Sequence, residues 1–248
     1  MDKFNEILNI LNCENYTHYN TKDHTFVKGI DPNMVLGRER FITIDEYICG
    51  IRRLIGYQDE ILGNLEAPRK KVAIYAGSFN PMHDGHLAII DRLSQEFDMV
   101  DVVVSPKNPL KDDSVYKNNF WQRYQDAVNK CSLLDNWGKV LVDRIEHDME
   151  PPYYYINTLK KLDWQFENCD NVPIFGADCL ETIEKWYNWK DILRNREVCI
   201  VPRKGYDGKK LLEDLKNKYP EDAKRWNIRF LDYDIPKISS TEIRNLEK

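Results

Sequence analysis

The chain has 248 residues, and its 36 basic and 41 acidic side chains give a formal net charge of −5 at neutral pH. This balance argues against bulk binding of nucleic acid, which normally requires an excess of basic residues. No apolar stretch approaches the roughly 18–20 residues of a membrane-spanning helix, and the polar start does not resemble a secretory signal. The six cysteines form no Cys-x-x-Cys pair, so we expect reduced thiols and a cytoplasmic protein.

Residues 1–68 are expected to form a mainly helical extension of unknown role. Apolar side chains recur at helical spacing over residues 2–11, whereas residues 15–40 are polar and show no clear period. A second helix is predicted over residues 44–55, with a continuation toward residue 62, because a Thr-x-x-Glu capping box stands at its start.

From residue 71 onward, short apolar runs alternate with segments of helical periodicity. Such alternation is typical of a doubly wound α/β fold, in which helices cover both faces of a parallel sheet. We expect this fold over residues 69–248, with ligands at the carboxyl ends of its strands. The predicted strands are 72–76, 100–104, 140–142, 172–175, 197–201 and 228–231, and the predicted helices are 85–97, 118–134, 155–163, 178–187 and 208–218.

The loop after the first of these strands combines small residues with two histidines. Gly77 and Ser78 leave room for a ligand close to the backbone and offer amide N–H groups. His83 and His86 are three residues apart, so one helical turn places both imidazoles on the same side. Gly85 lies between them, where the next helix is expected to begin. A single histidine here would be interpreted as a turn residue, but two imidazoles at a helix N-terminus favour a phosphate site.

A second phosphate cradle is predicted near the end of the chain, in the segment Ile-Ser-Ser-Thr-Glu-Ile-Arg. Ser239, Ser240 and Thr241 supply hydroxyl and amide groups at the start of a helix, and Arg244 follows about one turn later. Alone, this segment would be interpreted as a plain Ser/Thr N-cap. Together with the first loop, it indicates a site for the β- and γ-phosphates of a nucleotide.

These two segments resemble the signatures of the nucleotidyltransferase superfamily. The first, Ala-Gly-Ser-Phe-Asn-Pro-Met-His-Asp-Gly-His-Leu, matches G-(S/T)-F-x-P-x-H-x-G-H at every defining position, and the second is similar to I-S-S-T-x-I-R. Over about residues 71–244 the chain resembles nicotinate or nicotinamide mononucleotide adenylyltransferases, particularly the bacterial nicotinate type. The resemblance implies a Rossmann-like fold and transfer of the AMP moiety of ATP to a pyridine mononucleotide. That reaction releases pyrophosphate and forms NAD or deamido-NAD.

Three further segments carry the resemblance. Gly176 and Asp178 stand in a Gly-Ala-Asp turn, where the glycine allows close approach and the aspartate opens a helix. Trp186 begins a Trp-x-x-Trp segment and, by the resemblance, stacks on the pyridine ring, whereas Trp189 is interpreted as a core or anchoring residue. Arg203 lies in a Val-Pro-Arg-Lys-Gly loop, which the resemblance places near substrate or polyphosphate.

Two cations and one divergent segment complete the comparison. Lys111 ends a proline-rich loop and Arg123 occupies the family's arginine on the following helix, and for both the alternative is a solvated surface charge. In the segment that resembles the family's P-S-Y-T-x-D-T-L, Tyr153, Tyr155 and Asn157 replace Ser, Thr and Asp. In nicotinate-type enzymes this stretch lines the site of the pyridine carboxylate, so the two phenols leave the preference between acid and amide open.

The resemblance also implies a metal and a set of functional residues. Mg²⁺ is expected with ATP, held mainly by phosphate oxygens and water, so no protein ligand of a metal is assigned. A phosphate nucleophile is already anionic at neutral pH, so no general base is expected. The implied residues are His83, His86 and Arg244 for catalysis; Gly77, Ser78, Phe79, Gly85, Gly176, Asp178, Ile238, Ser239, Ser240 and Thr241 for ATP; and Asn80, Lys111, Tyr154, Tyr155, Thr158, Trp186 and Arg203 for the mononucleotide.

Two alternatives stay open at this level. One is a phosphopantetheine adenylyltransferase or cytidylyltransferase of the same superfamily, and the other is a nucleotide-binding regulatory protein, which the extension motivates. The expected partners are ATP and a pyridine mononucleotide, with no nucleic acid and no membrane, and a homo-oligomer is left open. The extension itself is interpreted either as packed on the core or on a second subunit. A sharper hypothesis is that its second helix covers the sheet in place of a C-terminal helical segment that relatives have.

Overall fold

The computed structural model describes residues 18–20, 25–27, 41–56, 68–112, 116, 118–194, 196–233, 236 and 240–246. For residues 18–20, 25–27, 41–46, 242, 245 and 246 it describes the backbone alone. The predicted helix over residues 2–11 and the continuation of the second helix toward residue 62 lie outside these ranges. None of the described helices is long and apolar enough to cross a lipid bilayer.

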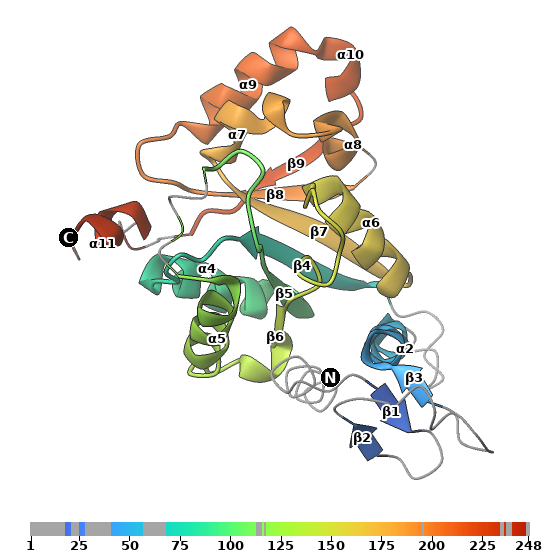
Figure 1. Ribbon diagram of the computed structural model, residues 1–248. Helices are drawn as coiled ribbons and strands as arrows, with labels where there is room; N and C mark the ends of the chain where they lie inside the picture. Colours follow the sequence, from blue (N-terminus) through green and yellow to red (C-terminus); the bar gives the residue numbers. More distant parts are fainter. Residues whose placement is uncertain are drawn as a thin grey trace.

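A six-stranded parallel sheet forms the centre of the described structure, with the strand order β6-β5-β4-β7-β8-β9 (Figure 1). The chain winds outward from β4 to β6 and then returns to build β7 to β9 on the other side, so the winding reverses between β4 and β7. This order confirms the predicted doubly wound fold. The strands are β4 (Lys70–Gly77), β5 (Met99–Val104), β6 (Val140–Asp143), β7 (Cys169–Gly176), β8 (Glu197–Val201) and β9 (Asn227–Phe230).

Helices connect these strands, as the sequence periodicity predicts, with one correction. The predicted helix over residues 178–187 is wrong in length, because the chain is extended at Trp186 and left-handed at Asn188, with φ of 49°. Asparagine is one of the few residues that accept this conformation. The helices and 3-10 turns are α4 (Asp84–Glu96), α5 (Phe120–Cys131), η3 (Trp137–Lys139), α6 (Tyr155–Gln165), α7 (Cys179–Thr182), η4 (Ile183–Lys185), α8 (Trp189–Leu193), α9 (Gly208–Lys218), α10 (Pro220–Ala223) and α11 (Ser240–Leu246).

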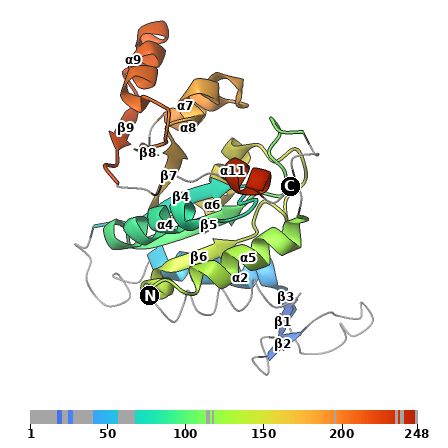
Figure 2. The same cartoon turned by 90° about the vertical axis from the view of Figure 1, so that its left-hand side faces the viewer.

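Two apolar layers enclose the sheet. Successive side chains of a strand point to opposite faces, so Ala73 and Tyr75 of β4 pack on the side of α4 and α5, whereas Val72 and Ile74 pack on the side of α6. Figure 1 shows α4 and α5 on one side of the sheet and α6 on the other, and Figure 2 shows α4 and α5 in front of the sheet. Because both faces are covered, the central strands are apolar almost throughout.

The N-terminal extension contains one helix and a small sheet in its described part. Helix α2 (Ile44–Gly56) begins at the residue that the capping-box spacing predicts. The antiparallel sheet β2-β1-β3, formed by β1 (His18–Asn20), β2 (Thr25–Val27) and β3 (Phe41–Thr43), was not predicted. Strands of three residues are too short to show an alternating pattern. On α2, Ile48, Ile51 and Ile55 are buried in the apolar layer on the α6 side, so this helix covers part of the sheet (Figure 1).

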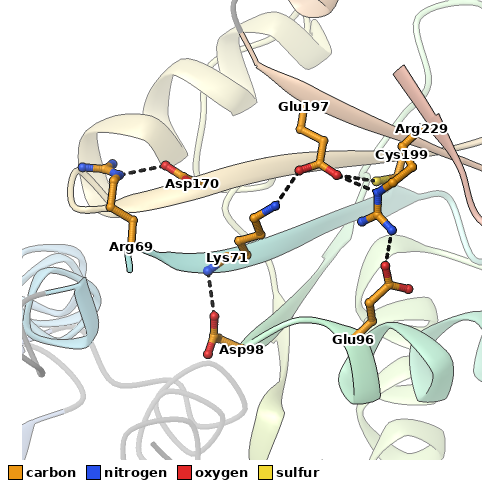
Figure 3. A network of polar contacts seen from close by, with 8 residues as sticks. All are labelled: Arg69, Lys71, Glu96, Asp98, Asp170, Glu197, Cys199 and Arg229. Atoms are coloured by element: carbon orange, nitrogen blue, oxygen red, sulfur yellow. Dashed lines mark hydrogen bonds and ion pairs between the residues drawn. The ribbon is translucent and has the colours of Figure 1, made fainter. Parts of the chain in front are cut away.

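A network of charged residues lies at the amino ends of the strands, opposite the end where ligands are expected. Glu197 accepts hydrogen bonds from Lys71 Nζ and Arg229 Nε, both at 2.7 Å, and Arg229 also pairs with Glu96 (Figure 3). These side chains are partly exposed, and pairs of this kind contribute about 0–1 kcal/mol each. The network therefore joins β4, β8, β9 and α4 without occupying the carboxyl ends of the strands.

Candidate active site

A cavity of about 520 Å³ lies at the carboxyl ends of the central strands, where the winding reverses. Its walls come from the segments after β4, β5, β6, β7 and β8 and from α11. This is where a doubly wound sheet is expected to bind a ligand. The sequence-predicted residues that line it are Gly77, Ser78, Phe79, Asn80, His86, Lys111, Tyr154, Tyr155, Gly176, Asp178, Trp186, Arg203, Ser240, Thr241 and Arg244.

The loop after β4 turns sharply because of two adjacent features. Phe79 is left-handed, with φ of 40°, and its ring is buried. A Cβ atom on Gly77 would lie 3.0 Å from that ring, so a larger residue at this point would require the ring to shift. Non-glycine residues adopt a positive φ at a conformational cost. The loop is thus held in one shape that exposes its backbone to the cavity.

The two histidines stand at the start of α4 and contact each other. Their rings stack at a centroid distance of 3.7 Å, and the backbone N–H of His83 donates to His86 Nδ1 at 3.3 Å. This bond assigns the proton of a neutral His86 to Nε2. His86 lines the cavity, whereas His83 lies behind it, and neither ring nitrogen of His83 has a partner among the described residues. Gly85 is buried within α4 and does not line the cavity.

Both imidazoles are uncharged at neutral pH in this structure. Burial lowers the pKa of His83 from 6.5 to about 4, and Arg203 and Lys130 act in the same direction. Burial likewise holds the pKa of His86 well below 6.5, with His83 and Arg203 contributing. The site therefore presents neutral N–H donors, beside cations on other elements.

A pH-dependent stability follows from the histidine pair. Between pH 6.5 and about 4 the unfolded chain binds protons that folded His83 does not, so stability falls as the pH is lowered through this window. The slope contributed by His83 should be at most ~1.4 kcal/mol per pH unit. Urea unfolding at pH 7.0, 6.0 and 5.0 checks this, because His83→Asn, which cannot be protonated there, should lose less stability than the parent on acidification. Equal losses in both proteins would contradict the assignment.

Arg123 connects the loops after β4 and β5. Its guanidinium is buried, donating to the carbonyl oxygen of Ser78, to that of Ser105 at 2.9 Å and to that of Pro106 at 2.8 Å. Tyr116 covers it, with its ring centroid 5.0 Å away. Arg123 is thus neither a surface charge nor a residue of the cavity wall. Its position on a helix of mixed polarity gave no signal of this role.

The second predicted cradle meets the first in space. Ser240 Oγ donates to the carbonyl oxygen of Pro81 at 2.9 Å, and Arg244 donates to that of Asn80 and, at 2.9 Å, to Thr241 Oγ1. Segments about 160 residues apart in the chain therefore form one wall of the cavity. Ile238 and Ser239, predicted to bind ATP, lie outside the described residues.

Aromatic rings line the other end of the cavity. Trp186 packs edge-on against Phe175 and Tyr155, with centroid distances of 5.4 and 5.9 Å. Tyr154 stacks on Tyr187 at 4.5 Å. Such an arrangement can hold a flat ring by its face. Trp189, by contrast, is buried in the apolar layer beside Trp226, as the sequence indicates for that position.

A buried acid that the sequence analysis did not assign stands beside these rings. Glu146 lines the cavity but is buried, and burial raises the pKa of its carboxyl. Thr158, predicted to bind the mononucleotide, instead donates to Glu146 Oε1 at 2.8 Å and is fully buried. Tyr155 points its phenol into the core, where it donates to the carbonyl oxygen of Ile74 at 3.4 Å. Tyr155, which replaces the family's threonine, therefore packs in the core as well as lining the cavity.

The cations that line the cavity come from separate loops and helices. Arg203, after β8, lies 3.8 Å from the Asp178 carboxylate. A Cβ on Gly176 would stand 2.3 Å from Asp178 Oδ1, so glycine is required for the aspartate to fold back in this way. The cavity-lining cations are Lys111, Lys185, Arg203 and Arg244. Among the residues that the structure describes, no cluster of three or more His, Cys, Asp or Glu could hold a metal ion.

Comparison with known proteins gives consistent matches to this part of the chain. Residues 74–246 match the family described as cytidylyltransferase-like. The chain is 32% identical over 176 residues to a probable nicotinate-nucleotide adenylyltransferase of Flavobacterium psychrophilum, which covers 70% of this chain and 84% of that protein. A Fusobacterium nucleatum protein of the same description is 33% identical over 181 residues, covering 72% and 88%. Plasmodium falciparum nicotinic acid mononucleotide adenylyltransferase complexed with NaAD shares the fold, with a TM-score of 0.55 at 21% identity over 71% of this chain and 83% of that chain.

Proposed function

We propose that this chain, which belongs to the cytidylyltransferase-like family and within it to the nicotinate-nucleotide adenylyltransferases, transfers the AMP moiety of ATP to the 5′-phosphate of a pyridine mononucleotide. The observation that carries the proposal is the division of one cavity. One end has the His86 donor and Arg244, and the other has Trp186 and its neighbouring aromatic rings. A dinucleotide product has phosphates in its middle and a flat ring at each end, so the two ends of the cavity suit its phosphates and its pyridine ring.

The reaction proceeds by one displacement at phosphorus. An oxygen of the mononucleotide phosphate forms a bond to the α-phosphorus of ATP, and the bond from that phosphorus to the α,β-bridging oxygen breaks, so pyrophosphate carries away the electron pair. No proton has to be removed from the nucleophile. Catalysis then consists of holding the two phosphates in line and stabilising the charge on the transferred group.

The residues at the phosphate end supply the required donors. We assign His86 Nε2–H, with His83 behind it, to the α- and β-phosphates, and the backbone amides of Ser78 and Phe79 to the incoming phosphate. Arg244, Ser240 and Thr241 would hold the leaving pyrophosphate, as charge-assisted hydrogen bonds to phosphate are strong. Support comes from the contacts of Ser240 and Arg244 with the loop after β4, which bring both motifs to one wall.

Mg²⁺ is expected to enter with ATP. The cavity wall is richer in hydrogen-bond donors and cations than in carboxylates, and Asp178 is already within 3.8 Å of Arg203. These groups suit phosphate oxygens better than a metal cage. We therefore expect phosphate oxygens and water to hold the ion, which would neutralise charge on the polyphosphate.

We place the reaction in the cytoplasm, since the cysteines of the described part of the chain are unpaired thiols.

The preferred mononucleotide is tested directly by kinetics. We expect AMP transfer to nicotinate mononucleotide, because the relatives at 32–33% identity are described as nicotinate-nucleotide enzymes. Because the buried Glu146 and the partly buried Tyr155 form part of the aromatic end, nicotinamide mononucleotide is the substrate to compare with it. The measurement is kcat/KM for pyrophosphate release with each mononucleotide at saturating ATP and Mg²⁺. A panel with phosphopantetheine in place of the mononucleotide, and CTP in place of ATP, tests the two superfamily alternatives, and turnover with those compounds alone would overturn the proposal.

Trp186 should affect one substrate more than the other. Stacking of an aromatic side chain on a heterocyclic ring contributes ~1–3 kcal/mol, so Trp186→Ala should raise the KM for the mononucleotide about 10-fold or more. The KM for ATP should stay within about twofold, because the phosphate end of the cavity is untouched. The matched control is Trp164→Ala, since Trp164 is 57% exposed on α6 and does not line the cavity. Equal increases in both KM values would show that Trp186 supports the fold rather than the ring.

A further inference from the structure

Helix α2 lies outside the residues that match the family, yet its side chains enter the core of the catalytic fold. The family match begins at residue 74, whereas α2 ends at Gly56. Ile48, Ile51 and Ile55 of α2 are buried against the sheet. On the same helix, Arg52 is only 1% exposed. An arginine is almost never buried to this degree unless it is paired, so its partners show what the helix does.

Two aspartates of the sheet point toward α2. Asp101 lies two residues before Val103 on β5, and Asp143 lies two residues after Leu141 on β6. Val103 and Leu141 face the α6 side of the sheet, so both aspartates face the same side. Both aspartates are buried, with exposures of 0% and 2%. Neither oxygen of Asp101 accepts a hydrogen bond from an N–H or O–H group of the described residues. Burial, together with the neighbouring Asp143, raises the pKa of Asp101 well above its usual value.

Arg52 supplies the opposite charge beside Asp143. Its guanidinium forms an ion pair with Asp143 and donates a second hydrogen bond to the side-chain oxygen of Gln165. The ring of Phe166 lies beneath it, with the centroid 5.2 Å away. Loss of Arg52 would remove the ion-pair partner of a buried carboxylate, and removing one partner of a buried pair is strongly unfavourable.

The two partners of Arg52 bracket a segment that carries part of the cavity wall. Asp143 is the last residue of β6, and its Oδ1 accepts the backbone N–H of Ile145 at 2.8 Å, next to Glu146. Gln165 is the last residue of α6, which begins with Tyr155. Glu146, Tyr154 and Tyr155 line the aromatic end of the cavity. The planar guanidinium therefore fixes both ends of the segment that forms this wall, through two directed bonds.

We infer that Arg52 is a positioning residue for the aromatic end of the cavity, so that the N-terminal extension is part of the catalytic unit rather than an appendage. Its kinetic test rests on the proposed function, since the aromatic end is assigned to the mononucleotide. The phosphate end is held separately, by Arg123, Ser240 and Arg244. Loss of the Arg52 bonds should therefore affect the two substrates unequally.

The test uses the full chain with Arg52→Lys, which keeps the charge but cannot bridge two partners in a planar fork. Through a shift of the wall, the KM for the mononucleotide should rise about 10-fold, whereas the KM for ATP should stay within about twofold. The matched control is Arg53→Met on the same helix, since the Arg53 side chain is 37% exposed and its Glu167 contact is at 3.7 Å. A variant that loses thermal stability but keeps both KM values would overturn the inference, and so would an equal rise of the two.

A second measurement separates this inference from the proposed function. Amide hydrogen exchange of residues 144–158 should be faster in Arg52→Lys than in the parent, whereas residues 77–80 should be unchanged. This readout needs no substrate, so it stands even if neither mononucleotide is used. If Arg52→Lys does not fold, the double variant Arg52→Met with Asp143→Asn removes both charges and should restore the fold. Exchange over residues 144–158 should nevertheless remain faster in this double variant than in the parent. Parent-like exchange in that double variant would overturn the inference.

Discussion

Replacing His86 with alanine should reduce pyrophosphate release at saturating ATP and mononucleotide by about 100-fold or more. Removing one preorganised donor from the charge that develops in a transition state typically costs this much. His86 is the histidine that lines the cavity, and its Nδ1 accepts the backbone N–H of His83 at 3.3 Å, which aims Nε2–H away from that bond. The imidazole is also desolvated and uncharged before substrate arrives, so it is a fixed dipole rather than a mobile charge.

The control for this variant is His147→Ala. His147 stacks on Phe120 at 4.3 Å and does not line the cavity, so its loss should leave turnover within about threefold of the parent. Circular dichroism and thermal unfolding should show that both variants are folded. Near-normal turnover by folded His86→Ala would exclude the assigned role of this histidine and, with it, the proposed mechanism.

Arg123→Met is expected to have the second largest effect. The guanidinium serves three carbonyl oxygens of the loops after β4 and β5, and each buried acceptor left without a donor costs ~1–3 kcal/mol. The free energy of unfolding should fall by about 3 kcal/mol or more, which corresponds to a decrease in melting temperature of roughly 10 °C. Because the same bonds shape the loop that bears Ser78, kcat/KM for ATP should also fall at temperatures where the variant is folded.

A comparison of three variants tests this account. Arg123→Lys keeps a positive charge but cannot serve the three oxygens at once, so it should resemble Arg123→Met in both stability and kcat/KM. The exposed Arg92→Met on α4 changes the same residue type without a buried contact and should leave both quantities unchanged. Full rescue by lysine would mean that charge, and not the shape of the loop, is what Arg123 contributes.

The phosphate end of the site could be predicted from the sequence because its residues are close together in the chain. The loop after β4 and the start of α4 lie within ten residues, so spacing alone places two histidines on one helical turn. Strand and helix alternation likewise reveals the doubly wound sheet, and such a sheet dictates the end at which ligands bind. The second motif could be predicted as a phosphate cradle, and the fold then brought it against Asn80 and Pro81.

Other parts of the site could not be predicted from the sequence, because they depend on contacts between residues that are distant in the chain. The resemblance singled out Arg123 but left a solvated surface charge as the alternative. Only the fold, which brings Ser78, 45 positions away, to its guanidinium, shows that Arg123 is buried and holds the loop. Of Glu146 and Thr158, the sequence analysis placed only the threonine in the site. In the structure Thr158 is buried and donates to Glu146, and it is Glu146 that lines the cavity. The helix predicted over residues 178–187 stops before Trp186, whose ring packs against Phe175 and Tyr155.

The N-terminal extension shows most clearly what the sequence determined and what the tertiary structure determined. Its second helix and its apolar face follow from local spacing, because helical periodicity depends on residues three and four apart. That Arg52 on this helix is buried follows only from the fold, which brings Asp143, 91 positions away, to its guanidinium. The sequence by itself thus determined the type of fold and which residues are the candidates for a phosphate site. Only the tertiary structure decided which charges are buried and which residues hold the walls, since burial depends on what packs from distant segments.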